Sequence, residues 1–263
     1  MVHPAVQRAT DGSAGDADYG AIGASYSDYR RPDARIAAVI EQALAGVRTV
    51  LNVGAGAGSY ETQAFETTAV EPSASMRAQR PAHLSPAIDA VAEALPFPDR
   101  SFDAAMTTFS VHQWSELKAG LREMRRVSRG PVLVLTCDPD LVRDFWLYEY
   151  APLVLDTEAR RYPAISEITA TLGGTAEVLP VPIPIDCTDG FNEAYYARPE
   201  RLLDPAARQS CSAWSFVDAP LAEQYTERLR AAIESGAWDE RHGHLRGQPQ
   251  LLGSLVLVRA LPA

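Results

Sequence analysis

The chain has 263 residues and a formal net charge of −10, with 24 Lys and Arg against 34 Asp and Glu. This balance argues against a nucleic-acid-binding surface, which needs clustered basic residues. The three cysteines are widely spaced and form no C-x-x-C motif, so a disulfide framework and a zinc ribbon are both disfavoured. No apolar run approaches the ~20 residues of a membrane span. We therefore expect a cytoplasmic protein, and the length fits one large α/β domain or a domain with a substantial insertion.

The N-terminal region begins with residues 1–18, which are rich in small and polar residues and are expected to be flexible. Aromatic and aliphatic residues then recur at spacings of three and four, and predict a short helix or turn: Tyr19, Ile22, Tyr26 and Tyr29. This stripe has two interpretations, either packing on the domain or forming a lid over a ligand. Residues 32–45 have the apolar spacing of a helix that begins at Pro32 and ends at Gly46.

The stretch from residue 49 to residue 60 predicts a buried strand followed by a glycine-rich turn. Val50, Leu51 and Val53 are apolar, and Gly54, Gly56 and Gly58 then occupy alternate positions. Glycine permits positive φ and a close approach of the backbone to a ligand. A strand, such a turn and a helix, expected here over residues 59–65, form the first half of a nucleotide-binding βαβ unit.

The next predicted strand, residues 67–70, ends at Glu71. A carboxylate at the tip of the second strand is placed to accept hydrogen bonds from the two hydroxyls of a ribose. The glycine turn and Glu71 together predict an adenosine-like ligand at the carboxyl edge of a parallel sheet.

Strands and helices alternate through the rest of this half of the chain. Helices are expected over 73–80, capped by Ser73, and over 116–127, capped by Ser115; strands are expected over 87–91, 102–108 and 132–136. This order predicts a doubly wound α/β sheet.

The pattern changes after residue 139. Residues 141–172 have helical spacing, and residues 176–185 resemble a strand with three alternating prolines, which favours a sheet edge or an extended loop. A helix over 220–235 and a last strand over 255–258 follow.

Four motifs in order resemble class I S-adenosylmethionine (SAM) methyltransferases of the ubiquinone-biosynthesis-like, small-molecule branch. Gly54-x-Gly56-x-Gly58 is similar to their motif I, whereas a dinucleotide site would need a third glycine at Ser59. The other matching stretches are Glu71-Pro72-Ser73 with Met76, the run from Ala92 to Asp103, and His112-Gln113-Trp114 with the block from Leu121 to Val127. One departure is Val91, where the family often has an Asp for the adenine amino group.

The resemblance implies a Rossmann-like, mostly parallel, seven-stranded sheet with SAM as cofactor and S-adenosylhomocysteine (SAH) as product. It implies a SAM-binding core with a lid over 19–140, and the rest of the sheet with acceptor-binding insertions over 141–263, in one continuous domain. In the family the last two strands form a hairpin, so we expect residues 186–250 to be an insertion that forms part of an acceptor pocket. The implied cofactor contacts are Tyr26, Arg30, Asn52, Val53, Gly54, Ala55, Gly56, Gly58, Glu71, Pro72, Met76, Ala92, Glu93, Phe109, Ser110 and Val111.

Methyl transfer needs few special side chains, because the cofactor supplies the reactive group. His112 is a candidate general base, with packing as the alternative role. Asp138, at the end of a predicted strand, is a second candidate, with helix capping as the alternative.

Residues that would form the acceptor pocket are aromatic, with one cation: Tyr19, Trp114, Trp146, Tyr195, Tyr196, Arg198 and Trp214. Asp239, His242 and His244 suggest a metal site, but the spacing of the two histidines does not place them on one helix face, so we expect no metal.

The expected function is SAM-dependent methylation of a small-molecule acceptor in bacterial secondary metabolism, by a monomer or homodimer. Two alternatives stay open at this point. One is a SAM-binding cyclase or pericyclase that does not methylate, and the other is an NAD-dependent oxidoreductase.

Overall fold

The structure is a computed structural model that describes residues 26–263, with side chains from Asp28 onward. The expected flexible segment 1–18, Tyr19 and the side chain of Tyr26 therefore lie outside the described residues. Within the described part of the chain, no helix combines the length and apolarity needed to cross a membrane.

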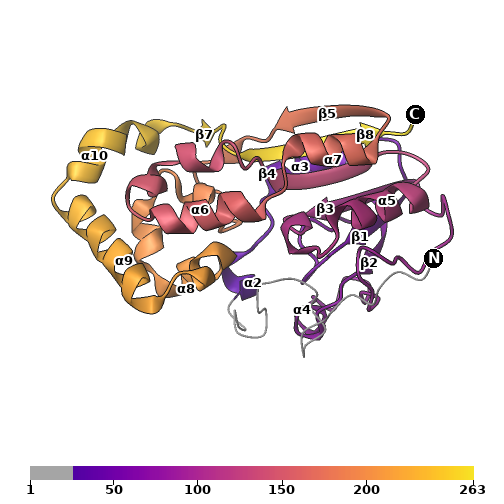
Figure 1. The fold of residues 1–263 in the computed structure, drawn as a ribbon, viewed down its shortest axis with the longest axis horizontal. Helices are drawn as coiled ribbons and strands as arrows, with labels where there is room; N and C mark the ends of the chain where they lie inside the picture. The colour runs from indigo at the N-terminus through magenta and orange to yellow at the C-terminus, as the bar shows by residue number, and fades with distance from the viewer. Residues whose placement is uncertain (1–25) are drawn as a thin grey trace.

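A six-stranded sheet with the order β2-β1-β3-β4-β8-β5 forms the centre of the fold (Figure 1). The first four strands are parallel, and β8 is antiparallel to both β4 and β5. The strand bounds are β1 Thr49–Val53, β2 Glu66–Val70, β3 Ala104–Thr108, β4 Val132–Cys137, β5 Thr175–Pro180 and β8 Leu255–Leu261. The mostly parallel sheet confirms the predicted fold class, and β5 lies at an edge, as its prolines predicted.

The expectation of seven strands is wrong for the described residues. The segment predicted as a strand over 87–91 contributes one bridging residue, Ile88, which pairs with Val70. Its N–H donates to Ala69 and its carbonyl accepts from Glu71. Pro86 has no N–H to extend this ladder, and Val91 and the residues after it line a cleft instead of continuing along the strand.

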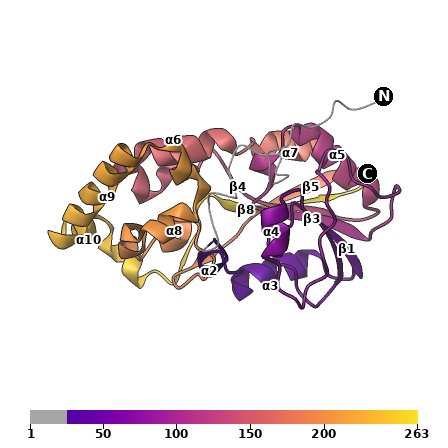
Figure 2. The ribbon, with the colours of Figure 1, turned by 90° about the horizontal axis from the view of Figure 1, so that it is seen from below.

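Helices cover both faces of the sheet (Figure 2). On one face, Ile36 and Ile40 of α3 (Ala34–Ala43) belong to a core cluster with Val50 and Met106. On the other face, α5 (Leu117–Val127) and α7 (Ile165–Leu172) cover a second cluster that includes Leu51. Neighbouring residues of β1 therefore point to opposite faces, as in a doubly wound sheet.

The helix expected over 59–65 does not form, and the chain continues as a turn. Tyr60 has φ +61°, a left-handed conformation that a helix cannot contain. Its hydroxyl donates to Asp189, and the next residue, Glu61, pairs with Arg80. These long-range contacts hold the segment away from helical geometry.

The other helices predicted for the first half of the chain are present, with ends shifted by no more than two residues. Ser73 caps α4 (Ala74–Ala78) by accepting from the N–H of Met76, as predicted. Ser115 does not cap α5, because its hydroxyl donates to Glu93 and the cap position is Glu116.

A helical region extends beyond the sheet on the side of α6, α8, α9 and α10 (Figure 1). The two-residue strands β6 (Ile183–Pro184) and β7 (Gln250–Leu251) pair with each other and close the base of the segment between them. The other helices are α2 Tyr26–Tyr29, α6 Pro152–Arg161, α8 Pro205–Gln209, α9 Ala219–Glu234 and α10 Ala237–His242; 3-10 helices are η1 Val111–Gln113, η2 Val142–Asp144, η3 Trp146–Glu149, η4 Asn192–Tyr195, η5 Pro199–Leu203, η6 Ser212–Phe216 and η7 Gly243–Gly247.

Candidate functional site

A cleft of about 840 Å³ opens at the carboxyl ends of β1, β2 and β3. The residues that follow the three strands, Gly54, Glu71 and Phe109, all line it. In open α/β sheets this edge is where ligands bind.

The glycine turn forms one wall of the cleft. Gly54 has φ +66°, and a Cβ at this position would lie 2.0 Å from the hydroxyl oxygen of Ser110. Gly56 has φ +52° and a Cβ there would lie 3.2 Å from Met76. The absence of side chains here lets the backbone and two neighbouring segments approach closely.

Glu71 joins the glycine turn to the second strand. Its Oε2 accepts from the N–H of Gly56 at 2.8 Å, and its Oε1 accepts from the N–H of Ser73 at 2.8 Å. Each carboxylate oxygen can accept two hydrogen bonds, so each keeps one acceptor position. Burial raises the pKa of Glu71, and the two backbone N–H groups oppose that rise.

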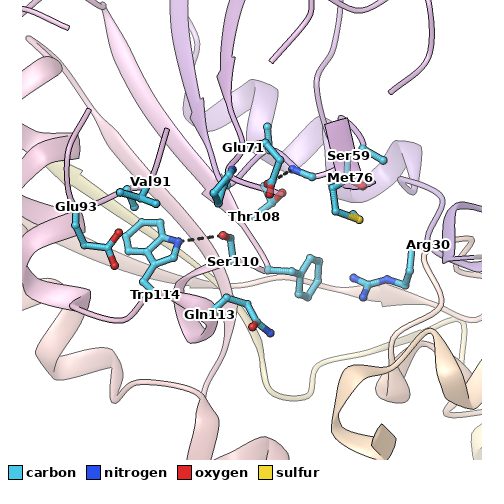
Figure 3. A pocket seen from close by; sticks show the side chains of 17 residues that line it. Arg30, Ser59, Glu71, Met76, Val91, Glu93, Thr108, Ser110, Gln113 and Trp114 are labelled. Atoms are coloured by element: carbon cyan, nitrogen blue, oxygen red, sulfur yellow. Dashed lines mark hydrogen bonds between the residues drawn. The ribbon is translucent and has the colours of Figure 1, made fainter. Parts of the chain in front are cut away.

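The far end of the cleft, away from Arg30, is lined by Val91, Glu93 and Trp114 (Figure 3). The indole N–H of Trp114 donates to the hydroxyl of Ser110 at 3.0 Å. Oε1 of Glu93 accepts from the hydroxyl of Ser115 and the N–H of Glu116, so this carboxylate holds the start of α5.

Arg30 lies at the opposite end of the cleft (Figure 3). Its Nε donates to Asp189 at 2.5 Å, and the other oxygen of Asp189 accepts from the hydroxyl of Tyr60. The guanidinium also lies over the ring of Phe109, 5.0 Å from its centre. Through Arg30, the segment before α3 therefore contacts both Asp189 and the Phe109 wall of the cleft.

Most of the predicted cofactor contacts come together in this cleft. Those that line it are Arg30, Gly54, Ala55, Gly56, Glu71, Pro72, Met76, Ala92, Glu93, Phe109 and Ser110. Four other predicted residues do not line it: Asn52, Val53, Gly58 and Val111. A Cβ on Gly58 would contact Leu84 and Arg80 instead.

The prediction omitted five residues that line the cleft: Ala57, Ser59, Val91, Thr108 and Gln113. The first four are next in sequence to a predicted contact, and Gln113 belongs to the motif His112-Gln113-Trp114. Their position beside predicted residues is the one sequence signal that could have identified them. Trp114, predicted for the acceptor pocket, lies in this cleft instead.

A second cavity, of about 480 Å³, adjoins the first, because Arg30 and Phe109 line both. Its other lining residues come from η1, from α6 with the residue that follows it, and from the segment 191–213. They are His112, Glu158, Arg161, Tyr162, Phe191, Asn192, Ser210, Cys211, Ser212 and Ala213. Sequence reasoning identified only His112 among these ten.

The two candidate catalytic residues lie in different surroundings. His112 lines the second cavity, and its ring meets the ring of Tyr162 edge-on at 4.8 Å. Burial, together with the charges of Arg161 and Arg30, lowers the pKa of His112 to about 3. Asp138 lines neither cavity, and its Oδ1 accepts from the N–H of Asp140, as a local cap does.

The predicted acceptor residues do not all gather in one cavity. Trp146 and Tyr196 line a third cavity, of about 940 Å³, which shares no lining residue with the other two. Trp214 is buried and donates from its indole N–H to Asn192 at 3.1 Å. Tyr195 is buried, and Arg198 donates to the backbone carbonyls of Cys187 and Ala194.

Two of the three residues considered for a metal site have charged neighbours. Asp239 pairs with Arg246 at 2.5 Å, and Nε2 of His242 lies 3.4 Å from Glu149. Among the residues from 26 onward, no group of three or more His, Cys, Asp or Glu side chains is arranged to hold a metal ion.

Comparisons with known proteins agree with this geometry. The sequence model of a family described as a methyltransferase domain matches residues 51–134. The chain is 37% identical over 92 residues to the ubiquinone/menaquinone biosynthesis C-methyltransferase UbiE of Hahella chejuensis, covering 30% of this chain and 37% of that protein. It is 36% identical over 75 residues to the uncharacterized protein YafE of Escherichia coli, covering 27% and 36%. The chain thus matches less than half of the length of these curated relatives.

A solved structure from Anabaena variabilis resembles nearly the whole chain. It is described as a candidate methyltransferase from an antibiotic biosynthesis pathway, and it is 29% identical, with a TM-score of 0.81 over 88% of this chain and 98% of that one. The YcgJ protein of Bacillus subtilis, 20% identical with a TM-score of 0.51 over 87% and 97%, shares the fold. The motifs, the sheet and these matches support a class I SAM-dependent methyltransferase, with the family match itself confined to residues 51–134.

Proposed function

We propose that this protein transfers the methyl group of SAM to a small-molecule acceptor. The observation that carries the proposal is the contact of the Glu71 carboxylate with the glycine turn at Gly56. It sets a carboxylate with two remaining acceptor positions beside a backbone without side chains, at the carboxyl edge of the sheet. This arrangement fits an adenosine whose ribose hydroxyls donate to Glu71.

The two ends of the cleft fit the two ends of SAM. Val91, Ala92 and Trp114 offer an apolar slot for the adenine, and the lack of a family Asp at Val91 leaves the backbone to recognise it. Arg30 fits the carboxylate of the methionine part, because its guanidinium lies at the opposite end. Bound SAM would supply an electrophilic methyl group on a sulfonium.

This chain's residues would align the acceptor and exclude water. The second cavity adjoins the Arg30 end of the cleft, so we assign the acceptor to it. The Anabaena relative's description supports a small-molecule acceptor. We also propose that His112 packs and forms hydrogen bonds, because an imidazole with a pKa near 3 takes up few protons at neutral pH.

Calorimetric titration with SAH tests the cofactor assignment. We expect micromolar binding to the wild type, loss of binding in Gly56→Trp, and roughly tenfold weaker binding in Glu71→Ala. Glu66→Ala is the control, because Glu66 begins the same strand and pairs with Arg48 at the exposed opposite end. Absent binding, or binding that ignores Gly56→Trp and Glu71→Ala, would refute the proposal.

Methyl transfer itself is tested by the fate of SAM. With a substrate that turns over, we expect one SAH for each product and a product heavier by one methylene unit. Intact SAM after complete turnover would show that the cofactor does not donate its methyl, and would favour the cyclase alternative.

A further inference from the structure

The second cavity is lined mainly by polar side chains, although it adjoins an aromatic boundary. Phe109, which lines both cavities, has φ +50°, and its ring lies 5.3 Å from the ring of Phe191. Beyond this pair the wall carries hydroxyl, amide, imidazole, guanidinium and carboxylate groups. An acceptor in this cavity therefore meets hydrogen-bonding groups and not the apolar aromatic wall that the sequence suggested.

Glu158 of α6 is the one carboxylate among the residues that line this cavity. Its Oε2 accepts from the side-chain amide of Asn192 at 2.7 Å, which fixes the carboxylate in place. Glu158 lies deep in the protein but keeps some accessible surface because it faces the cavity. Burial raises the pKa of Glu158, which makes its carboxylate a stronger base than an exposed glutamate.

Two arginine side chains act on Glu158. The charges of Arg30 and Arg161 act on both Glu158 and His112, and they lower the pKa of each. Bound SAM would add a third positive charge at the adjoining end of the cleft. An ammonium group is disfavoured in such surroundings, whereas the developing negative charge of a hydroxyl oxygen that loses its proton is stabilised.

We propose that Glu158 is the proton acceptor of the reaction and that the acceptor molecule is methylated on a hydroxyl group. The inference rests on the proposed function. The hydroxyl oxygen forms a bond to the methyl carbon as the carbon–sulfur bond breaks, and that electron pair stays on sulfur in SAH. The hydroxyl proton passes to a carboxylate oxygen of Glu158 and leaves to water after the product departs.

Other titratable groups act on Glu158 or are acted on by it, and each belongs in the interpretation of a pH profile. They come from five segments: Arg30, Cys137, Arg161 with Tyr162, Glu193 and Cys211. His112 lines the same cavity. Burial raises the pKa of Cys137 and Tyr162 well above their ordinary values and that of Cys211 to about 12. His112 is neutral down to a pH near 3, so neither the thiols, the phenol nor the imidazole competes with Glu158 for a proton near neutral pH.

Benzyl alcohol and benzylammonium make a matched pair of probes, because they share a skeleton and differ in the reacting group. Each is titrated into SAH-loaded protein at pH 7 by calorimetry. We expect benzyl alcohol to bind at least tenfold more tightly than benzylammonium. Equal or tighter binding of benzylammonium, or binding of neither probe, would overturn the inference.

Variants on one helix separate the role of Glu158 from a general effect on α6. Glu158→Gln, which keeps the shape and an acceptor for Asn192, is expected to weaken benzyl alcohol binding at least fivefold, and Glu158→Asp is expected to recover part of this. Asp156→Asn is the control, because Asp156 pairs with the partly exposed Arg143 at 2.7 Å and lines neither cavity. It should stay within twofold of the wild type.

The pH dependence supplies a readout that a structural role would not change. Benzyl alcohol should bind the wild type more weakly as Glu158 becomes protonated, because a neutral carboxyl accepts a weaker hydrogen bond. Glu158→Gln should remove this acid limb. A limb unchanged by the substitution would reject Glu158 as the group involved.

SAH binding distinguishes the failure of this inference from failure of the proposed function. All four proteins should bind SAH with the same affinity, which also shows that each is folded. If the wild type binds no SAH, the proposed function fails. If SAH binds normally but Glu158→Gln leaves benzyl alcohol binding unchanged, only the present inference fails.

Discussion

The carboxylate of Glu71 accepts a hydrogen bond from the backbone N–H of Gly56 at 2.8 Å, across the gap between the ends of two neighbouring strands. The bond orients Glu71 before any ligand arrives, and burial raises its pKa. An ionised carboxylate accepts hydrogen bonds from a ribose more strongly than a protonated one does. The affinity for SAH should therefore fall as the pH is lowered towards the raised pKa of Glu71.

Calorimetry from pH 8 down to the acid range, with wild type and Glu71→Gln, checks this expectation. The variant should bind SAH more weakly at pH 8 and show a flatter dependence on pH. An identical pH dependence in both proteins would mean that another group controls the affinity.

Gly54→Ala tests the close packing of the glycine turn on Ser110. The new Cβ would lie 2.0 Å from the Ser110 hydroxyl oxygen, and φ is +66°, so we expect both lost stability and loss of SAH binding. Gly46→Ala is matched, because its φ is +87° but nothing lies within 4 Å of the new Cβ. The control should cost about 1–2 kcal/mol from backbone strain alone and bind SAH normally. Urea unfolding and SAH titration measure both effects.

Glu61 and Arg80 form an ion pair in which both side chains are at most 4% exposed. Glu61→Gln leaves the guanidinium buried without its full countercharge, and we expect a loss of about 3–5 kcal/mol in the free energy of unfolding. Glu66→Gln breaks the exposed pair with Arg48 and should cost no more than about 1 kcal/mol. Similar losses in the two variants would contradict this account.

Glu193 should make the protein less stable as the pH rises. Burial raises its pKa from 4.5 to about 7, although the N–H and hydroxyl of Ser254 oppose the shift. Between pH 4.5 and 7 the folded state holds a proton that the unfolded state has released, so stability falls across this window by about 3 kcal/mol. Urea unfolding of the wild type and Glu193→Gln at both pH values isolates this term, because the difference in stability between the two proteins should change by this amount.

His112 should have the opposite effect on stability, in an overlapping but more acidic pH range. Its pKa is lowered to about 3, so its contribution is complete above pH 6.5 and is lost as the pH falls towards 3. In proton NMR spectra the ring signals of His112, assigned with His112→Asn, should not shift between pH 8 and 5. A shift in this range would show an imidazole that protonates in the folded protein.

Most strands and helices of the first half of the chain were predictable from the sequence, because their signals lie in residues close to one another in the chain. Gly54, Gly56 and Glu71 follow directly from strand ends, and parallel strands bring such ends to one edge. The turn at Tyr60 was not predictable in this way. Its conformation depends on Asp189, which is 129 positions away in the sequence.

The predicted acceptor residues do not share one cavity, for a related reason. Trp146, Tyr195 and Tyr196 were chosen as aromatic residues, but aromatic side chains are as suited to a core as to a pocket wall, and burial depends on long-range packing. Glu158 has no motif around it, and only the fold shows that it faces the same cavity as His112 and Asn192.

The order of strands in the sheet has a consequence for how the protein is made. Within the described sheet β5 pairs only with β8, and residues 181–254 are synthesised between the two. On the ribosome β5 therefore emerges long before its partner strand. By then β1, β2, β3 and β4 have all been synthesised and can pair with one another. The parallel part can assemble during translation, and the β5 edge must wait for the chain to reach residue 261.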